Sequence, residues 1–282
     1  MAGELSKAVL ITGCSTGIGR ATAERLARDG WTVYATARRP ESLALLGAAG
    51  CKTLALDVCD EASMRAAVET VEAAHRAVGV LINNAGYGLE GPFEEVPMAE
   101  IRRQFETNVF GLIRLTQMVL PAMRRQRWGR VVNLSSMGGA LTFPGGAFYH
   151  ATKYAVEALS DALRFEVCGF GIEVIVIQPG PIKSGFGDTA VANLTAVAAD
   201  SPYAAFRAAL AKAIPEAYEG PMARMVGTSE EVASVIEQAI TAEHPRTRYR
   251  ITAAARILIA LRRILPDRAF DAFLRTQLKP PG

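Results

Sequence analysis

Residues 7–19 read KAVLITGCSTGIG, and this stretch predicts the fold of the chain. Its apolar half predicts a short buried strand. Its glycine-rich half, spaced GxxxGxG, ends that strand before a helical pattern that runs through Leu26. A strand, a glycine-rich turn and a helix can hold a phosphate, because bare backbone approaches the anion and the helix N-terminus points its amides at it. Glycine also permits ordinary turns, but the strand and helix on either side favour nucleotide binding. We expect nucleotide contacts here from Gly13, Ser15, Thr16, Gly17, Ile18 and Gly19.

A second apolar stretch, residues 31–36, predicts the next strand, and Ala37, Arg38 and Arg39 follow it. A carboxylate at the end of this strand would accept hydrogen bonds from the 2′-hydroxyl of NAD, whereas an arginine there suits the 2′-phosphate of NADP. With two guanidinium groups and no carboxylate, the sequence predicts NADP(H) in preference to NAD(H). The alternative is that Arg38 and Arg39 are an ordinary solvated pair before a helix that starts at Pro40.

Two further apolar stretches, residues 53–56 and 78–82, predict the third and fourth strands. The third leads into Asp57, and an acid in this region can meet the adenine amine or cap the helix that starts at Asp60. Both roles are open to the neighbouring acids. The fourth strand ends at residues 83–86, where small side chains would let a flat ring lie against the backbone. From these segments we expect cofactor contacts from Asp57, Val58, Asn84, Ala85 and Gly86.

A long amphipathic helix is predicted at about residues 99–125, and Asn108 lies on it among apolar residues, with Gly111 one turn further on. A buried asparagine needs hydrogen-bond partners or water. Taken by itself, Asn108 is better explained by local structure than by catalysis.

Side chains suited to proton transfer follow the fifth predicted strand, residues 130–134. Ser135 and Ser136 stand at its carboxyl end, where open α/β sheets bind their ligands. Tyr149 and Lys153 are four residues apart, so on a helix they lie one turn apart on one face. A tyrosine has a pKa of about 10. Lowering it by two or three units takes about 3 to 4 kcal/mol, which a desolvated lysine and a positively charged cofactor ring can supply jointly. The alternative is an ordinary surface pair.

Together these segments resemble the short-chain dehydrogenase/reductase family over residues 7–186, and their joint order and spacing are far more specific than any one of them. The matching segments are TGCSTGIG at residues 12–19, Asp57, NNAG at 83–86, Asn108, Ser136, YHATK at 149–153 and PGPIKS at 179–184. The resemblance implies a doubly wound parallel sheet, the Rossmann fold. It also implies an enzyme that reversibly oxidises an alcohol to a carbonyl with a nicotinamide dinucleotide.

The resemblance assigns roles to individual residues. Tyr149 would transfer the substrate proton, and Lys153 would lower the pKa of Tyr149 and bind the nicotinamide ribose. Ser136 would hold the carbonyl oxygen, and Asn108 would anchor a water molecule in the proton relay. Ser136 is preferred to Ser135 because the family's serine usually lies thirteen residues before the tyrosine, and because adjacent strand residues point to opposite faces. Further cofactor contacts are implied for Tyr149, Lys153, Pro179, Gly180, Ile182 and Ser184, the last standing where the family more often has threonine.

The glycine loop and residues 33–39 and 84–88 look most like the branch that contains hydroxysteroid and retinol dehydrogenases. That likeness implies a hydrophobic small-molecule substrate, such as a steroid, a retinoid or a lipid-like alcohol, ketone or aldehyde. After a sixth predicted strand at residues 172–177 comes the region, 185–226, where the family places its substrate-covering segment. Its alanine-rich sequence carries scattered Phe186, Tyr203, Phe206 and Met222. Ordinary helix packing explains this composition equally well.

The chain ends in a helical extension, about residues 253–282, that is longer than a minimal member of the family needs. Before it, Ser229 is expected to cap a helix, and residues 246–252 predict a last strand. Between residues 251 and 265 apolar side chains cover most of the helix surface, so this helix is expected to bury itself. It could pack on the core, close the substrate pocket, join a second subunit, or lie on a membrane surface with its arginines towards the lipid headgroups.

Composition fits a single domain over residues 1–282, because 50% of the residues are apolar and no linker or repeat interrupts the chain. A net charge of +3 argues against nucleic acid as a partner. Four cysteines and three histidines show no metal-ligand spacing, so no metal is expected. The sequence shows no secretory signal and no apolar stretch long enough to span a bilayer. We therefore expect a cytoplasmic protein, or one bound peripherally to a membrane.

By analogy with the family, a homodimer or homotetramer is expected through the helices at about residues 99–125 and 149–168. Three alternatives compete with an NADP-dependent reductase of a hydrophobic substrate. One is an NAD-preferring dehydrogenase of another small carbonyl compound. Another is a dinucleotide-binding sensor or scaffold without chemistry, which predicts the loss of at least one of the four catalytic groups. The third is a relative of epimerases or dehydratases, which usually have a different glycine loop and a longer C-terminal substrate domain.

Overall fold

The computed structural model describes residues 5–185, 194, 201–219 and 225–278. Seven parallel strands form one sheet in the order β3-β2-β1-β4-β5-β6-β9. These strands are β1 (Val9–Ile11), β2 (Val33–Ala37), β3 (Lys52–Ala55), β4 (Val80–Asn83), β5 (Gly129–Leu134), β6 (Ile172–Pro179) and β9 (Arg248–Ile251). The strand order reverses between β1 and β4, and that reversal opens a ligand crevice at the carboxyl ends of the strands.

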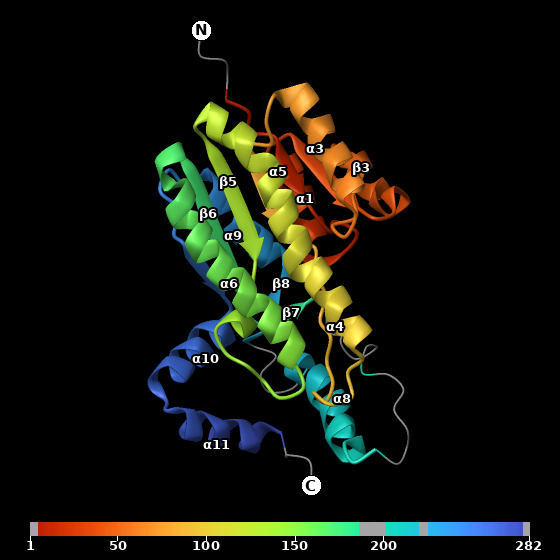
Figure 1. Ribbon diagram of the computed structural model, residues 1–282, viewed down its shortest axis with the longest axis vertical. Coiled ribbons are helices and arrows are strands. Elements are labelled where there is room, and N and C mark those ends of the chain that lie inside the picture. Colours follow the sequence, from red (N-terminus) through yellow and green to blue (C-terminus); the bar gives the residue numbers. More distant parts are fainter. Residues whose placement is uncertain (1–4, 186–193, 195–200, 220–224, 279–282) are drawn as a thin grey trace.

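Helices cover both faces of the sheet, as the doubly wound fold requires (Figure 1). Those that connect or flank the strands are α1 (Gly17–Arg28), α2 (Ala44–Ala48), α3 (Glu61–His75), α4 (Met98–Phe105), α5 (Gly111–Gln126), α6 (Ala147–Val167) and α9 (Ser229–Thr241). Short turns of helix lie at Pro40–Leu43, Cys168–Phe170 and Met137–Gly139. Beyond the carboxyl ends of the strands lie the small sheet β7 (Ile182–Lys183) and β8 (Gly227–Thr228), and the helices α8 (Ala204–Glu219), α10 (Ala253–Ile264) and α11 (Asp267–Gln277).

The central strands β1, β4, β5 and β6 are mostly apolar because both sides of the sheet are buried there, whereas the edge strands β3 and β9 carry lysine, threonine and arginine and are more exposed. Side chains of β1 alternate between the two faces: Val9 and Ile11 pack with α1, α2 and α9, whereas Leu10 packs with α3 and α5. All three side chains are fully buried. The expected doubly wound parallel sheet is therefore confirmed.

Two expectations about the helices need correction. The helix expected at residues 99–125 is interrupted by a π-helical turn, Glu106–Phe110, between α4 and α5. Such turns insert one extra residue per turn and are frequent at functional sites. The cap of α9 is Thr228 and not Ser229. The hydroxyl of Thr228 accepts from the amide of Glu231, whose carboxylate accepts from the amide of Thr228 in return, which completes a capping box.

The helix α10 buries only part of its surface, so the expectation that this apolar helix buries itself holds for one face alone. Ile259 is fully buried against Leu141 and Phe270, whereas the side chain of Ile257 is 56% exposed and that of Ile264 is 79% exposed. Within the described residues, none of the helices combines the length and the apolar content that crossing a bilayer demands.

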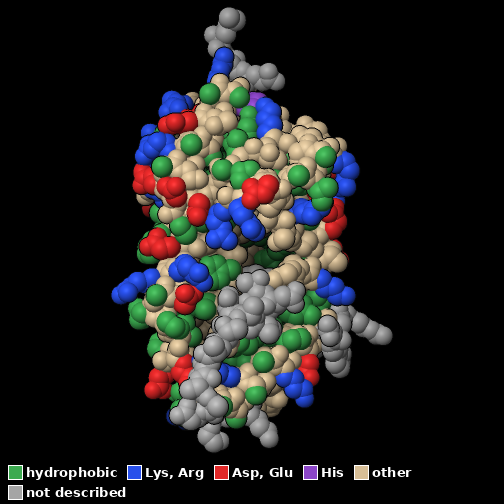
Figure 2. All heavy atoms as spheres, turned by 90° about the vertical axis from the view of Figure 1, so that its right-hand side faces the viewer, with side chains coloured by type: hydrophobic (Ala, Val, Ile, Leu, Met, Phe, Trp, Pro, Cys, Tyr) green, Lys and Arg blue, Asp and Glu red, His purple; other side chains and the backbone are tan. Residues whose placement is uncertain are grey.

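The region expected to cover the substrate, residues 185–226, is described only in part. Phe186 and Met222 belong to segments outside the described residues. Of the rest, α8 is held beside the loop after β4 by an ion pair of 2.8 Å between Arg207 and Glu95. Phe206 is buried, and the hydroxyl of Tyr203 donates to Glu94. On the face seen in Figure 2, Lys and Arg side chains are interspersed with Asp and Glu, in keeping with the small net charge of +3.

Candidate active site

A cavity of about 1120 Å³ lies at the carboxyl ends of the strands. Most of the residues expected to bind the cofactor line it, namely Gly13, Ser15, Thr16, Gly17, Ile18, Arg38, Asp57, Val58, Asn84, Ala85, Gly86, Pro179, Gly180, Ile182 and Ser184. Ser136, Tyr149 and Lys153 line the same cavity. Gly19, Arg39 and Asn108 do not. One cavity therefore joins the glycine loop to the expected proton-transfer residues.

The glycine loop has the geometry of a phosphate cradle. Gly13 and Gly17 have φ angles of +72° and +58°, which side chains disfavour. A Cβ on Gly19 would stand 2.4 Å from the carbonyl oxygen of Gly13 and 2.4 Å from the side-chain nitrogen of Asn84. Gly19 therefore allows the turn to close and does not face the cavity.

The N-terminus of α1 fits the phosphates of a dinucleotide. Thr16, which precedes α1, makes no side-chain cap, so backbone amides at this end of the helix are available to an anion. Arg38 lies at the rim of the cavity at the end of β2. Arg39 is exposed, and its carbonyl oxygen accepts hydrogen bonds from the hydroxyl and the backbone amide of Ser42 in the turn that follows.

The two acids after β3 have different contacts. Asp60 caps α3 by accepting a hydrogen bond of 2.9 Å from the amide of Ala62. Asp57 accepts from the amide of Cys59 at 2.9 Å and lines the cavity. Of the two roles left open by the sequence, Asp60 therefore takes the cap, and Asp57 has the position for a cofactor contact.

Tyr149, Lys153 and Ser136 meet at the inner end of the cavity. Tyr149 and Lys153 are both buried on α6, and the Lys153 nitrogen lies 5.8 Å from the centre of the Tyr149 ring. That nitrogen donates a hydrogen bond of 2.7 Å to the carbonyl oxygen of Leu134 at the end of β5. The side chains of Ser136 and Tyr149 are hydrogen-bonded. The hydroxyl of Ser135 instead makes a long contact of 3.5 Å with the carbonyl oxygen of Ser136, so the geometry favours Ser136 as the partner of Tyr149.

The electrostatics of this group differ from the expectation in one respect. Burial raises the pKa of Tyr149, and the hydrogen bond from Ser136 opposes that rise only in part. Burial also lowers the pKa of Lys153 to about 8. The expected lowering of the Tyr149 pKa by Lys153 is therefore not a property of the polypeptide by itself, because desolvation outweighs an ammonium at this distance. The lowering of this pKa stays a prediction for the complex with a positively charged cofactor ring, which the sequence argument also invoked.

The side chain of Asn108 makes three hydrogen bonds with the protein. Its side-chain nitrogen donates to the carbonyl oxygen of Tyr87 at 3.0 Å and to the hydroxyl of Thr152 at 3.1 Å, and its side-chain oxygen accepts from the amide of Tyr87 at 3.1 Å. It is 2% exposed and lies on the π-helical turn. These contacts favour the local-structure interpretation: Asn108 positions the segment after β4 against α6.

Two further polar groups of the cavity have no role in the sequence analysis. Glu90 comes from the loop after β4 and His150 follows Tyr149 on α6; both line the cavity. Burial raises the pKa of Glu90 to about 7 and lowers that of His150 to about 4. The sequence contains no signal for Glu90, and His150 was considered only as a metal ligand.

The outer part of the cavity is apolar. Its walls come from the loop before α6, from α8, and from the C-terminal helices α10 and α11; the apolar residues are Phe143, Leu210, Ile214, Leu258, Phe273 and Leu274. The C-terminal extension therefore contributes to the cavity and packs on the protein's own fold.

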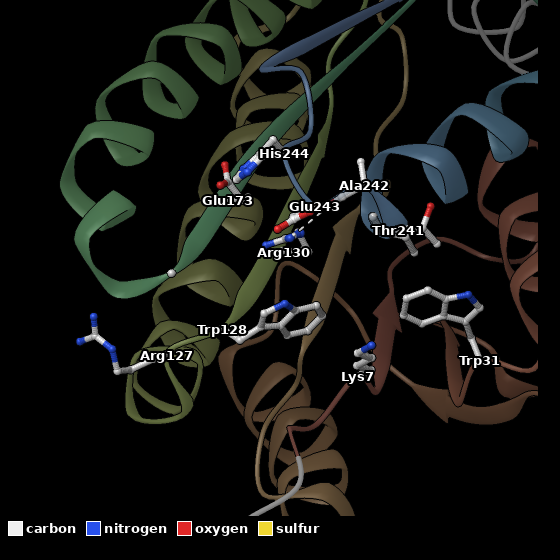
Figure 3. Close-up of a pocket in the computed structure, with 12 residues that line it drawn as sticks. Lys7, Trp31, Arg127, Trp128, Arg130, Glu173, Thr241, Ala242, Glu243 and His244 are labelled. Atoms are coloured by element: carbon white, nitrogen blue, oxygen red, sulfur yellow. Dashed lines mark hydrogen bonds between the residues drawn. The ribbon is translucent and has the colours of Figure 1, made fainter. Parts of the chain in front are cut away.

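A second cavity, of about 460 Å³, opens at the amino ends of the strands (Figure 3). Lys7, Trp31, Trp128 and Arg130 line it, and the guanidinium of Arg130 lies 5.2 Å from the ring of Trp128. None of the residues expected in the active site is among those lining it. The chemistry indicated by the sequence therefore belongs to the larger cavity.

A Rossmann sheet with a glycine cradle, joined by one cavity to a buried tyrosine and lysine, defines an oxidoreductase that uses a nicotinamide dinucleotide. The family model for the short chain dehydrogenases matches residues 7–195, so the chain belongs to the short-chain dehydrogenase family. It is an NAD(P)-dependent dehydrogenase or reductase.

Three similar proteins illustrate the relationship. The 3-ketodihydrosphingosine reductase of Bacteroides thetaiotaomicron is 41% identical over 64% of this chain and 65% of its own length. The NADPH-dependent 3-dehydrocapnine reductase of Ornithobacterium rhinotracheale is 34% identical over 96% of each chain. A crystal structure of a short-chain dehydrogenase from Streptomyces avermitilis is 35% identical, covers 97% of this chain and 96% of that chain, and superposes with a TM-score of 0.78.

Proposed function

We propose that the protein uses NADPH to reduce a ketone or aldehyde on a hydrophobic, lipid-like molecule, and that the reaction is reversible. The observation that carries this proposal is the single cavity in which Tyr149 and Ser136 lie between a phosphate cradle and an apolar wall. A bound nicotinamide supplies the hydride. Tyr149 donates the proton, and Ser136 holds the carbonyl oxygen against it.

Lys153 has two functions in this proposal. Its hydrogen bond to the carbonyl oxygen of Leu134 fixes the ammonium beneath the cavity, where it can bind the nicotinamide ribose. Its positive charge adds to that of the oxidised cofactor and thereby favours the phenolate of Tyr149 in the oxidation direction.

The preference for NADPH rests on Arg38, which lies at the end of β2 in a position to bind a 2′-phosphate. No carboxylate competes with it there, because β2 is followed by Arg38, Arg39 and Pro40. One relative is named as NADPH-dependent. An NAD-preferring enzyme of another carbonyl compound is the alternative that the Arg38 experiment in the Discussion addresses.

The hydrophobic substrate class rests on the outer part of the cavity. Leu210 from α8, Leu258 from α10 and Phe273 from α11 form apolar walls around the route to Tyr149. An alkyl chain placed there would be removed from water at a gain of about 0.8 kcal/mol for each buried CH₂ group. Two similar proteins are named as reductases of 3-ketodihydrosphingosine and of 3-dehydrocapnine.

The experiment is to follow NADPH oxidation with purified protein and a panel of ketones, retinals and aliphatic aldehydes of increasing chain length. We expect kcat/KM to rise with chain length until the apolar part of the cavity is filled. A preference for short, polar carbonyl compounds would contradict the hydrophobic substrate class. No turnover of any carbonyl compound, in a protein that still binds NADPH, would favour the sensor or scaffold.

We further propose that the protein is a homodimer or homotetramer through α5 and α6, which lie side by side on one face (Figure 1). Large apolar side chains are exposed on α6 and on the π-helical turn that leads into α5: Phe165 of α6 is 84% exposed and Phe110 of the turn is 51% exposed. Phe165→Glu should dissociate the assembly in a sedimentation experiment, whereas an unchanged mass would refute this interface.

For location, we propose that the protein is cytoplasmic and contacts membrane surfaces through the exposed Ile257 and Ile264 of α10. Flotation with liposomes tests it, and an Ile257→Glu/Ile264→Glu variant is the control. Absence of binding by the unmodified protein would exclude membrane contact.

A further inference from the structure

The carboxylate of Glu90 enters the cavity from the loop after β4. It lines the cavity close enough to Tyr149 to raise the pKa of the phenol electrostatically. Among the described residues, none forms an ion pair or a hydrogen bond with this carboxylate, and burial alone accounts for its raised pKa. The loop that carries it is fixed, because the amide of Gly91 donates to the carbonyl oxygen of Gly145 at 2.8 Å. Glu90 is half-buried, so its carboxylate is open to the cavity while burial raises its pKa.

His150 presents a second acceptor at the same place. Its Nδ1 lies 3.2 Å from the carbonyl oxygen of Gly138. A carbonyl oxygen can only accept, so Nδ1 carries the proton and Nε2 is left with a lone pair. Burial lowers the pKa of His150 to about 4, so the ring is neutral near pH 7 and Nε2 stays an acceptor.

The two acceptors converge beside the expected proton donor. A Cβ built on Gly146 would stand 2.6 Å from Nε2 of His150 and 2.9 Å from Oε2 of Glu90, so both atoms border the same point. The rings of His150 and Tyr149 are 5.5 Å apart between their centres. A substituent of a substrate whose carbonyl oxygen meets Tyr149 can reach Glu90 and His150, because all three residues line the same cavity.

We propose that Glu90 and His150 bind an ammonium group on the carbon next to the substrate's carbonyl, so that the preferred substrate is an α-amino ketone with an apolar chain. Two acceptors with no donor between them call for a group with several donors. An ammonium offers three donors and a positive charge, whereas a hydroxyl offers one donor and no charge. This inference rests on the proposed carbonyl reduction and names the chemistry of its substrate.

The charge balance of the cavity is consistent with this assignment. Two titratable groups near Glu90, Tyr149 and His150, are both neutral near pH 7. Burial raises the pKa of Glu90 to about 7. A bound ammonium would lower that pKa and hold the carboxylate ionised, because an opposite charge at hydrogen-bond distance favours the charged form.

The experiment compares three ketones of equal chain length that carry an amino group, a hydroxyl group or hydrogen on the carbon next to the carbonyl. The measured quantity is kcat/KM with NADPH for the unmodified protein, for Glu90→Gln and for Glu69→Gln. Glu69 is exposed on α3 and does not line the cavity, so its variant makes the same change of charge elsewhere. We expect the unmodified protein and Glu69→Gln to prefer the amino ketone over the plain ketone by about tenfold to a hundredfold.

In Glu90→Gln the ratio of the amino ketone to the plain ketone should fall at least tenfold, mainly through KM. An NADPH-binding titration of the same variant shows whether the fold and the cofactor site are intact, and His150→Phe should reduce the same ratio in an independent protein. Turnover of the plain ketone with no preference for the amino ketone would overturn this inference alone. The inference would also be overturned if the hydroxy ketone had the same kcat/KM as the amino ketone and if Glu90→Gln lowered both values by the same factor. Failure to reduce any of the three ketones would overturn the proposed function and this inference with it.

Discussion

The side-chain amide of Asn108 donates a hydrogen bond of 3.1 Å to the hydroxyl of Thr152, the residue immediately before Lys153 on α6. Both residues are buried, and the hydroxyl of Thr152 in turn donates to the carbonyl oxygen of Tyr149 at 2.7 Å. The π-helical turn between α4 and α5 is thereby tied to the helix that carries both expected proton-transfer residues. This bond links the shape of one helix to the placement of the side chains on another.

Thr152→Val tests this link. Valine has nearly the shape of threonine but cannot accept from Asn108, so one buried N–H group loses a partner. We expect a loss of about 1 to 3 kcal/mol in the free energy of unfolding, measured with chemical denaturants. Thr70→Val on α3 is the control, because its hydroxyl is exposed and bonds only to Ala66 in its own helix. Equal losses in the two variants would argue against a special role for the Asn108 contact.

Tyr149→Phe should nearly abolish reduction of any carbonyl substrate while leaving NADPH binding intact, because only the proton donor is removed. Tyr154→Phe, on the same helix but exposed, should retain activity. Single-turnover measurements of NADPH oxidation, together with an NADPH-binding titration, distinguish the two effects. Full turnover by Tyr149→Phe would refute the assignment of the proton donor.

Arg38→Asp should weaken NADPH binding by at least about tenfold, equivalent to about 1.4 kcal/mol, and should reduce the preference for NADPH over NADH. The added carboxylate repels the 2′-phosphate and offers an acceptor to the 2′-hydroxyl of NADH. Arg39→Asp makes the same change one residue further on, where the side chain does not line the cavity. If neither variant changed the preference for NADPH over NADH, Arg38 would be an ordinary solvated loop residue.

His150 should make the protein less stable in acid. Burial lowers its pKa to about 4, below the unfolded value of about 6.5. As pH falls through about 6.5 the unfolded state takes up the proton first, so stability decreases until about pH 4, by up to about 3 kcal/mol. Glu90 acts in the opposite sense, since its pKa is raised to about 7. Comparison with His150→Gln separates the effect of the histidine from that of Glu90. As pH falls over this range, the free energy of unfolding of the unmodified protein should decrease relative to that of His150→Gln. Parallel pH profiles for the two proteins would show that His150 is not held neutral.

Much of the fold could be predicted because its signals are local. A short apolar strand followed by glycines at residues 13, 17 and 19 can form few structures other than a strand, a turn and a helix. The sequence could not separate Gly19, which closes the turn, from Gly13 and Gly17, which face the cavity, because that difference depends on Asn84 from another strand. The choice between Arg38 and Arg39 likewise required the course of the backbone after β2.

The features that the sequence analysis missed depend on contacts between distant segments. Glu90 belongs to a loop with no periodic pattern, and its proposed role depends on the approach of that loop to Gly146 and His150. The pattern of apolar residues does not distinguish the π-helical turn at Asn108 from ordinary α-helix. The cap at Thr228 lies one residue before the expected Ser229, because both residues are good caps and the reciprocal bond with Glu231 decides between them.

The apolar walls contributed by α10 and α11 come from chain that follows the last strand of the sheet. Mutations in these two helices would alter the length and width of the apolar outer part of the cavity without disturbing β1 to β6 or the glycine loop. Exchange of this one C-terminal segment, in evolution or by engineering, would therefore change the selectivity for substrate chain length. The residues that carry out the reaction would stay the same.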